Sequence, residues 1–369
     1  MKIAIIGDLH FGIKDGSYNA FIYQKHFFED ILKPNLKDVD GMIFLGDIYH
    51  HRRIVNMRIL SESIKLFNNL HKETQIPIYC VAGNHDLYFR NAYDTATVKD
   101  ISLGEAFYGE DDYYIINNDC LVVHWKNTGD EYKELFERIK KETDITKIKY
   151  IFGHFAIVGS VMLANRKDDN FMDLKRDAFM QYFPNLKKVY SGHFHTPSVN
   201  GIVKYIGVPY HLTWSDAESK LGFYILDTES EKETFVENPF KAFKYIRINE
   251  NTIRDIDYNQ LINSLPELNY KMLYKIIYNG NEYDFIAKSL YNGIINKGQD
   301  ALLIDENVYN VSDINDEEVN NSVKNIGELI ENYFLHTKII PEGEGKFYYD
   351  IFKMFYEEVQ KLSENIEIA

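Results

Sequence analysis

Three apolar runs near the amino terminus each end in side chains that can bind a metal ion. The runs resemble strands, and helix-like segments at Tyr18–Leu36 and Asn56–Thr74 separate them, a pattern typical of an α/β fold. In such folds ligands bind beyond the carboxyl ends of the strands, so the sequence predicts a polar site there. The runs and the residues after them are Lys2–Gly7 with Asp8 and His10, Gly41–Gly46 with Asp47, and Ile76–Ala82 with Asn84, His85 and Asp86.

The tetrapeptide Gly83–Asp86 places three kinds of functional group at the mouth of one strand. The Asn84 carbonyl oxygen can bind a metal, the His85 imidazole can move a proton, and the Asp86 carboxylate can hold that imidazole in one tautomer. Gly83 permits the sharp turn that presents them. Taken alone, such a tetrapeptide is more commonly a polar turn. Its significance comes from the similar residues at the other strand ends.

The next part of the chain is richer in strands and repeats the pattern. A run at Ile148–Phe152 is followed by His154, and a run at Lys188–Ser191 is followed by His193 and His195. The last two histidines are two residues apart on an extended segment, so their imidazoles point to the same side. Further strands are predicted at Tyr113–Ile116, Cys120–Trp125, Val203–Gly207, Gly222–Asp227 and Thr234–Val236, with a helix at Asp130–Glu142.

The character of the chain changes around Pro239–Ile248, and we predict three parts with boundaries at 1–240, 241–312 and 313–369. The second part is a small α/β module. The third is an acidic, asparagine-rich linker followed by two amphipathic helices, whose apolar faces fit either packing within the chain or docking in a partner's groove. The elements predicted in the second part are a helix at Asp257–Leu265, a strand at Met272–Tyr278, a helix at Glu282–Ile295 and a strand at Ala301–Ile304.

The net charge of −15 argues at first against a nucleic-acid partner. The excess is uneven, however, because residues 249–369 hold 22 acidic and 10 basic residues, whereas residues 1–248 hold 34 and 31. The acidity therefore belongs mainly to the carboxyl-terminal part, and a basic groove in the first part remains compatible with the composition.

Three observations bear on location and cofactors. The two cysteines, Cys80 and Cys120, lie in apolar runs, which favours buried, reduced thiols and a cytosolic protein. No apolar run approaches the roughly 18 residues that a membrane span needs, and the amino terminus resembles a first strand more than a signal peptide. Gly343–Lys346 resembles part of a phosphate-binding loop but lacks the first glycine and the following Ser or Thr, so any dependence on ATP must come from a partner.

Five motifs together resemble those of the calcineurin-like metallophosphoesterases, in the order of that family. The resemblance implies a β-sandwich flanked by helices and a centre of two divalent metal ions, of which manganese is the ion we expect. It also implies how the ligands divide: Asp8, His10, Asp47 and His195 for the first ion, and Asp47, Asn84, His154 and His193 for the second. The motifs are Asp8-Leu9-His10, Gly46-Asp47, Gly83-Asn84-His85-Asp86, Gly153-His154 and Gly192-His193-Phe194-His195.

The same resemblance implies the chemistry at this centre. Water activated by the metal ions attacks phosphorus in line, and His85, which is not a ligand, protonates the leaving oxygen. Asp86 is expected to assist His85. His50, three residues after the bridging carboxylate of Asp47, is expected to contact the phosphate or aid catalysis, although a solvated histidine beside His51 is the plain alternative.

Within the family, further segments resemble the SbcD-type DNA double-strand-break repair nucleases, and most closely the recombination endonuclease subunit of large phages. The resemblance covers residues 1–240. It implies a 3′-to-5′ exonuclease and single-strand endonuclease in the cytosol of a bacterium or a phage-infected host. It also implies a capping module that binds DNA, carboxyl-terminal helices that dock on an SMC-type coiled-coil ATPase, and a homodimer. The segments are Gly46–His50, Tyr205–Tyr210 and Leu212–Asp216.

Basic residues near the predicted site are candidates for DNA contacts. Arg52 and Arg53 follow the second strand end, and Arg90 follows the third. Phosphate contacts dominate DNA affinity, so cations placed here fit that purpose, but a solvated loop explains each arginine equally well. Two other functions stay open: a free-standing metallophosphoesterase acting on nucleotides or phosphoproteins, and a scaffold that tethers DNA and cleaves it only incidentally.

Overall fold

The computed structural model describes residues 1–87, 107–108, 112–157, 161–163, 166–167, 177–250, 252, 258–263, 265, 268–305, 346 and 353. By its contacts the chain divides into two compact units, Met1–Ile304 and Asp305–Ala369. The predicted boundary near residue 240 falls inside the first unit and stays a prediction, as does the boundary at 312. The two predicted carboxyl-terminal helices lie outside the described residues.

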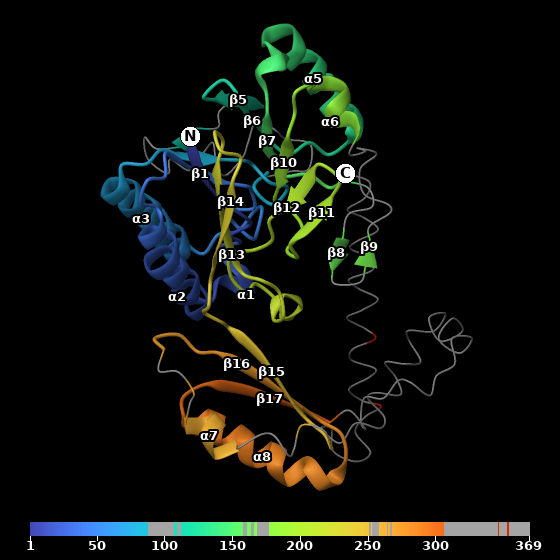
Figure 1. Ribbon diagram of the computed structural model, residues 1–369. Coiled ribbons are helices and arrows are strands. Elements are labelled where there is room, and N and C mark those ends of the chain that lie inside the picture. The colour runs from blue at the N-terminus through green and yellow to red at the C-terminus, as the bar shows by residue number, and fades with distance from the viewer. Residues whose placement is uncertain are drawn as a thin grey trace, which may run out of the picture. The chain divides into compact units, whose positions relative to one another are not determined.

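Two six-stranded sheets form the centre of the first unit (Figure 1). In spatial order, one contains β14 (Glu233–Glu237), β13 (Gly222–Asp227), β1 (Lys2–Ile6), β2 (Gly41–Phe44), β3 (Ile78–Cys80) and β4 (Phe107–Tyr108). The other contains β11 (Ser198–Asn200), β12 (Val203–Tyr205), β10 (Lys188–Ser191), β7 (Tyr150–Gly153), β6 (Cys120–Val123) and β5 (Tyr113–Ile116).

The sheets pack face to face because their strands are apolar on both sides. On β1, Ile3 and Ile5 belong to a buried cluster shared with Val122 and Phe152 of the second sheet. The alternate residue Ile6 belongs to the cluster beneath the helices on the outer face. This alternation buries both faces of the strand, and the expected β-sandwich flanked by helices is confirmed.

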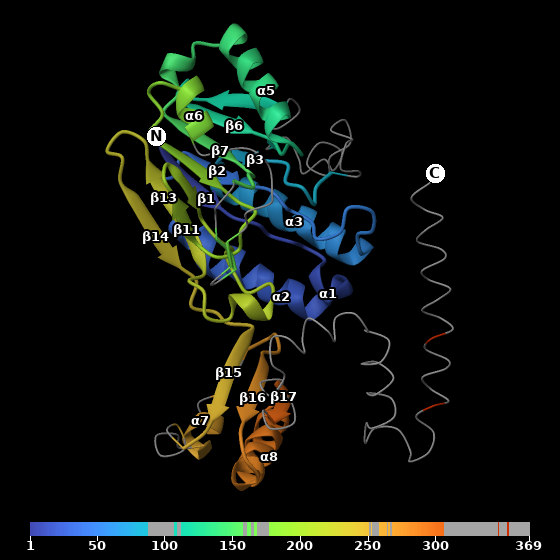
Figure 2. The ribbon, with the colours of Figure 1, turned by 90° about the vertical axis from the view of Figure 1, so that its right-hand side faces the viewer.

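Helices cover the outer faces of the two sheets (Figure 2). The 18-residue helix α3 begins at an Asn56 side chain that accepts hydrogen bonds from the amides of Arg58 and Ile59, which satisfies donors that the helix itself leaves unpaired. The predicted helix at Tyr18–Leu36 is confirmed in extent, but it contains a π-helical turn at Phe27–Leu32 and a 3₁₀ turn at Lys33–Asn35. In the described part of the chain, the α-helices of the sandwich are α1 (Ile13–Gly16), α2 (Tyr18–His26), α3 (Met57–Thr74), α5 (Gly129–Glu142) and α6 (Asp177–Tyr182), whereas α7 (Tyr258–Asn263) and α8 (Asn281–Asn296) lie beside the smaller sheet (Figure 2).

Parallel pairing brings the carboxyl ends of the central strands to one edge of each sheet. Strands β1, β2 and β3 are parallel in the first sheet, and β6, β7, β10 and β12 are parallel in the second. The polar residues that follow β1, β2, β3, β7 and β10 therefore gather where the two sheets meet.

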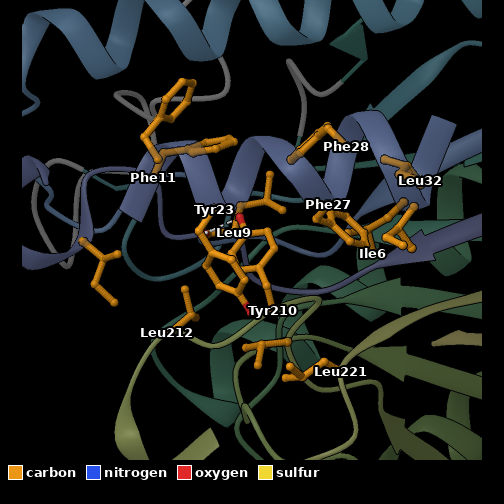
Figure 3. Packing of buried hydrophobic residues seen from close by; sticks show 14 of the residues in the cluster. Ile6, Leu9, Phe11, Tyr23, Phe27, Phe28, Leu32, Tyr210, Leu212 and Leu221 are labelled. Atoms are coloured by element: carbon orange, nitrogen blue, oxygen red, sulfur yellow. Dashed lines mark hydrogen bonds between the residues drawn. The ribbon is translucent and has the colours of Figure 1, made fainter. Parts of the chain in front are cut away.

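Aromatic packing supports the segment that follows β1. Leu9, Phe11, Tyr23 and Tyr210 are buried in one cluster (Figure 3). The Tyr210 hydroxyl donates a hydrogen bond to the main-chain oxygen of Leu9 at 2.8 Å, and the side-chain amide of Gln24 donates to the same oxygen at 2.9 Å. These two hydrogen bonds thus hold the backbone next to His10 in place.

A smaller sheet follows the sandwich in the chain. It contains β15 (Phe243–Ile248), β16 (Leu273–Tyr278) and β17 (Asp300–Asp305), and helix α8 packs on it through Tyr283, Ala287 and Leu290. The sequence predicts the last two strands but not β15. A separate two-stranded ribbon is formed by β8 (Val161–Leu163) and β9 (Arg166–Lys167).

Glu233 on β14 links the two large sheets of the sandwich. Its carboxylate accepts hydrogen bonds at 2.7 Å from Lys188 and Tyr190 of β10, and also from Lys204 of β12. Burial raises the pKa of the Glu233 carboxyl, but these contacts outweigh burial and lower the pKa to about 2. The charged carboxylate is therefore favoured by the folded state.

We expect Glu233→Gln to lower the free energy of unfolding at pH 7 by about 1 kcal/mol, because the carboxylate is partly exposed and its ion pairs are screened. The pKa is lower in the folded state than the ordinary 4.5, so the stabilisation is present above that value and is lost as the pH falls towards 2. Urea unfolding at several pH values measures this, with Glu237→Gln on the same strand as the control. A stability difference that does not shrink in acid would contradict the assignment.

Candidate metal centre

The backbone at the shared edge is shaped to present side chains. His10 and Asp47 each have φ of 48° and His193 has φ of 83°, values in the left-handed region that most residues avoid. Gly46 has φ of 103°, and a Cβ there would lie 2.6 Å from Nδ1 of His154. Unfavourable backbone of this kind persists where the surrounding structure enforces it, and it is concentrated at functional sites.

Three potential metal-binding atoms face one another at one end of the site. Oδ1 of Asn84 lies 3.0 Å from Nε2 of His154 and 3.1 Å from Nδ1 of His193, and the two ring nitrogens are 3.2 Å apart. Nδ1 of His154 donates to the main-chain oxygen of Leu45 at 2.7 Å, so Nε2 carries a lone pair in the neutral ring. Atoms this close fit a shared cation, since ligands about 2.1 Å from one ion lie about 3.0 Å apart in octahedral and about 3.4 Å apart in tetrahedral coordination.

Carboxylates and two more imidazoles complete the site. Oδ2 of Asp47 lies 3.5 Å from Nε2 of His154 and 3.6 Å from Nε2 of His10. This oxygen therefore lies near candidate ligands of both predicted ions, and it would be placed to bridge them if two cations were bound. On the far side, Nε2 of His195 lies 4.0 Å from Oδ2 of Asp8, and potential ligand atoms of Asp8, His10 and His195 lie within 4.8 Å of one another.

The remaining carboxylate oxygens are held by main-chain amides. The amide of His85 donates to Oδ1 of Asp47 at 2.8 Å, and the amide of His193 donates to the Asp8 carboxylate at 3.0 and 3.1 Å. These bonds fix both carboxylates in place. The structure thus brings together all seven residues for which the sequence predicts metal ligation, and their donor atoms fit two ions.

The site buries its carboxylates almost completely. Burial raises the pKa of Asp8 to about 6. Burial also raises that of Asp47, but the neighbouring imidazoles of His154 and His10 outweigh it and lower its pKa. Buried carboxylates are costly unless a positive charge compensates them, and divalent cations at this position would supply that charge.

His85 lies beside these residues with one ring nitrogen fixed by the main chain. Its Nδ1 lies 2.6 Å from the oxygen of His50, so a proton on Nδ1 is held there and Nε2 is the nitrogen that can exchange one. The sequence predicts that Asp86 orients the His85 ring, whereas in the structure a main-chain carbonyl does so. The Asp86 carboxylate instead accepts from the amides of Gly83 and Ile48 at 2.9 and 3.0 Å, because it is buried beneath both loops.

The predicted catalytic residue His50 lies with two of the three arginines predicted to contact DNA. His50 is half-buried, with Nδ1 at 3.3 Å from Nδ1 of His10, and together with His85, Arg52 and Arg53 it lines an open cavity of about 650 Å³. Burial and neighbouring imidazoles lower the pKa of His50 to about 4. Arg90 lies outside the described residues.

Two residues near the centre are not predicted as site residues from the sequence. The ring centroid of Trp125 lies 5.2 Å from that of His193 and 5.6 Å from that of His154. Asp216 faces His195, with 3.7 Å between Oδ1 and Nδ1. Both residues occur in segments that the sequence singles out, but neither is adjacent to a metal-binding motif in the chain.

A sandwich whose strand ends gather carboxylates, imidazoles and an amide that could hold metal ions has the architecture of a metallophosphoesterase. The chain belongs to the calcineurin-like phosphoesterase family, whose model matches residues 1–197. Among individual proteins it is similar to exonuclease subunit 1 of Enterobacteria phage T4, with 28% identity over 246 residues, which are 64% of this chain and 68% of that protein. The resemblance to a phage nuclease subunit is thereby confirmed.

Two solved structures are more distant. A novel archaeal phosphodiesterase is 14% identical with a TM-score of 0.29, covering 64% of this chain and 100% of that one. A hypothetical protein from Thermus thermophilus is 13% identical with a TM-score of 0.35, covering 65% and 100%. Similarity this weak supports no conclusion about function. Within the described part of the chain, no helix is both long and apolar enough to cross a bilayer.

Proposed function

We propose that this chain is a metal-dependent DNA nuclease, acting as a 3′-to-5′ exonuclease on duplex ends and as an endonuclease on single strands. The observation that carries the proposal is the meeting of seven ligand side chains from five strand ends, with His85 beside them. The similarity to a phage exonuclease subunit supports DNA as the substrate. Polarity and strand preference come from the resemblance to the SbcD-type nucleases.

The residues divide the chemistry between them. Two divalent cations held by the seven ligands would supply Lewis-acid activation of the phosphate and of water. Because the ligands are nitrogen and oxygen without thiolate, we propose manganese as the preferred ion. His85 gives the leaving oxygen its proton from Nε2, while Nδ1 stays bonded to the His50 carbonyl. Asp47 holds the amide of His85 and so keeps the proton donor beside the metal ligands.

A substrate panel tests this function directly. We expect the purified chain with manganese to shorten linear duplex DNA from its 3′ ends and to cut single strands, with less activity in magnesium and none after chelation. The panel also contains a DNA hairpin, a small phosphodiester, a nucleotide monophosphate and a phosphopeptide. Hydrolysis confined to the nucleotide or the phosphopeptide would instead identify a free-standing phosphoesterase, and DNA binding without turnover would identify a scaffold.

We further propose that the nuclease forms a homodimer and works with an SMC-type coiled-coil ATPase in double-strand-break repair. The proposal draws on the sequence resemblance, on the lack of a nucleotide-binding loop, and on the two amphipathic patterns between residues 321 and 369.

Deletion of the residues after Asn320 should abolish binding of the ATPase while manganese-dependent cleavage of single-stranded DNA persists. Co-purification with the ATPase measures the first outcome, and a gel assay measures the second. Light scattering of the full chain tests the dimer. Retained ATPase binding by the shortened chain would count against this role of the carboxyl-terminal helices.

A further inference from the structure

Asp216 is a buried carboxylate with one oxygen fully engaged and the other not. It ends the short 3₁₀ turn Trp214–Asp216. Oδ2 accepts hydrogen bonds from the amides of Leu212 at 3.0 Å and Thr213 at 2.7 Å, and from the Thr213 hydroxyl at 3.2 Å. Within the described part of the chain, Oδ1 is buried and has no partner at hydrogen-bond distance.

The group that faces this free oxygen is the imidazole of His195. Nδ1 of His195 lies 3.7 Å from Oδ1 of Asp216, whereas Nε2 lies on the side of the Asp8 carboxylate, at 4.0 Å. The ring therefore stands between two carboxylates, with Nε2 directed to the metal centre. A buried carboxylate oxygen without a partner destabilises the fold, and a small rotation of His195 towards Asp216 would supply that partner.

We propose that Asp216 is a positioning residue for the first metal ion, acting through His195. Nδ1–H of His195 donates to Oδ1 of Asp216, which leaves the lone pair of Nε2 for the metal ion and makes the ring a stronger ligand. A metal-bound histidine generally needs such a partner to fix its tautomer and orientation. The inference rests on the metal centre of the proposed function but not on DNA as the substrate.

Packing on the other side of the turn makes Asp216 a rigid support. The ring of Trp214 lies 4.8 Å from that of Phe243 and 5.0 Å from that of Tyr245, and the Lys275 ammonium lies 4.2 Å above the Trp214 ring. The turn is thus held between His195 and the strands β15 and β16. A ligand is best supported by a partner that cannot itself move.

Manganese affinity, measured by calorimetry on the full chain, tests the proposal. We expect Asp216→Asn to weaken binding of one of the two ions by about 10- to 100-fold. The fluorescence of Trp125, whose ring centroid lies 5.2 Å from that of His193, reports the ion next to His193, and Trp214 is kept because its packing supports the Asp216 turn. That ion should be bound with an affinity close to that of the unchanged chain, which a general collapse of the fold would not allow.

Three further variants separate positioning from structure. Thr213→Ala removes the hydroxyl that donates to Oδ2 of Asp216 but does not change Oδ1, the oxygen that faces His195. The metal affinity should therefore not change even if the melting temperature falls. Glu218→Gln, an exposed acid-to-amide change close to the turn, should have no effect on affinity. In a cycle with His195→Ala, the Asp216→Asn effect should disappear, because Asp216 acts only through that ring.

Two outcomes would overturn the proposal. One is normal manganese affinity in Asp216→Asn, and the other is an Asp216→Asn effect that stays the same in the His195→Ala background. Absence of manganese binding by the unchanged chain would instead remove the metal centre itself, and with it the proposed function. The two failures are therefore distinguishable.

Discussion

Replacing Asp47 by asparagine is expected to abolish phosphodiester cleavage, with a loss of at least about 10³-fold in kcat/KM, because metal ions contribute several kcal/mol to such reactions. Oδ2 of Asp47 lies 3.5 Å from Nε2 of His154 and 3.6 Å from Nε2 of His10. It is the carboxylate oxygen that stands close to ligands from both halves of the site. An amide has no negative charge to bridge two cations, so calorimetry should show weaker binding of both ions.

Asp38→Asn is the matched control for this variant. Asp38 is exposed, lies three residues before β2, and has φ of 62°, a left-handed backbone like that of Asp47 at 48°. The same chemical change at the same kind of backbone position should leave activity and metal affinity unaltered. Wild-type turnover in Asp47→Asn, with both ions bound, would exclude Asp47 as the bridging ligand.

Many strands of the fold can be predicted from local sequence patterns. Apolar runs flanked by polar turns predict β1, β10 and β13 with end points within a residue of the observed ones, since burial on both faces requires such runs. Local sequence patterns do not predict which strands distant in the sequence pair with each other. Strand β13 lies antiparallel beside β1 although more than 200 residues separate them. Strand β15 is missed because the change in composition around Pro239 suggests a boundary there.

The candidate site also has a part that the sequence predicts and a part that it does not. The candidate metal ligands are predictable because they are unusual side chains at strand ends, the positions where an α/β sheet places its ligands. The partner of the His85 ring is a main-chain carbonyl of His50, and since every residue has a carbonyl, no side-chain pattern reveals it. The Asp86 carboxylate instead accepts a hydrogen bond from the main-chain amide of Gly83 in its own loop. The position of that amide depends on the folded backbone, so no side-chain pattern reveals this contact either.

His85→Ala separates catalysis from metal binding. We expect turnover on DNA to fall by about 10²- to 10⁴-fold, which is the usual contribution of a positioned proton donor, while both ions and DNA still bind. The amide of residue 85 continues to hold Oδ1 of Asp47, so the metal ligands keep their positions. His71→Ala is the control, because Nδ1 of His71 also contacts a main-chain oxygen, that of Ile76 at 2.9 Å, but on the last turn of α3.

The leaving group distinguishes a proton donor from a residue that merely shapes the site. A nitrophenyl phosphodiester releases an anion that needs no proton, so His85→Ala should lose far less activity on this substrate than on DNA. Equal losses on both substrates would mean that His85 acts in some other way, for example by placing the phosphate. Turnover of the unchanged chain no faster than that of the variant would favour the DNA-tethering scaffold, because a site with its proton donor in place would then confer no catalytic advantage.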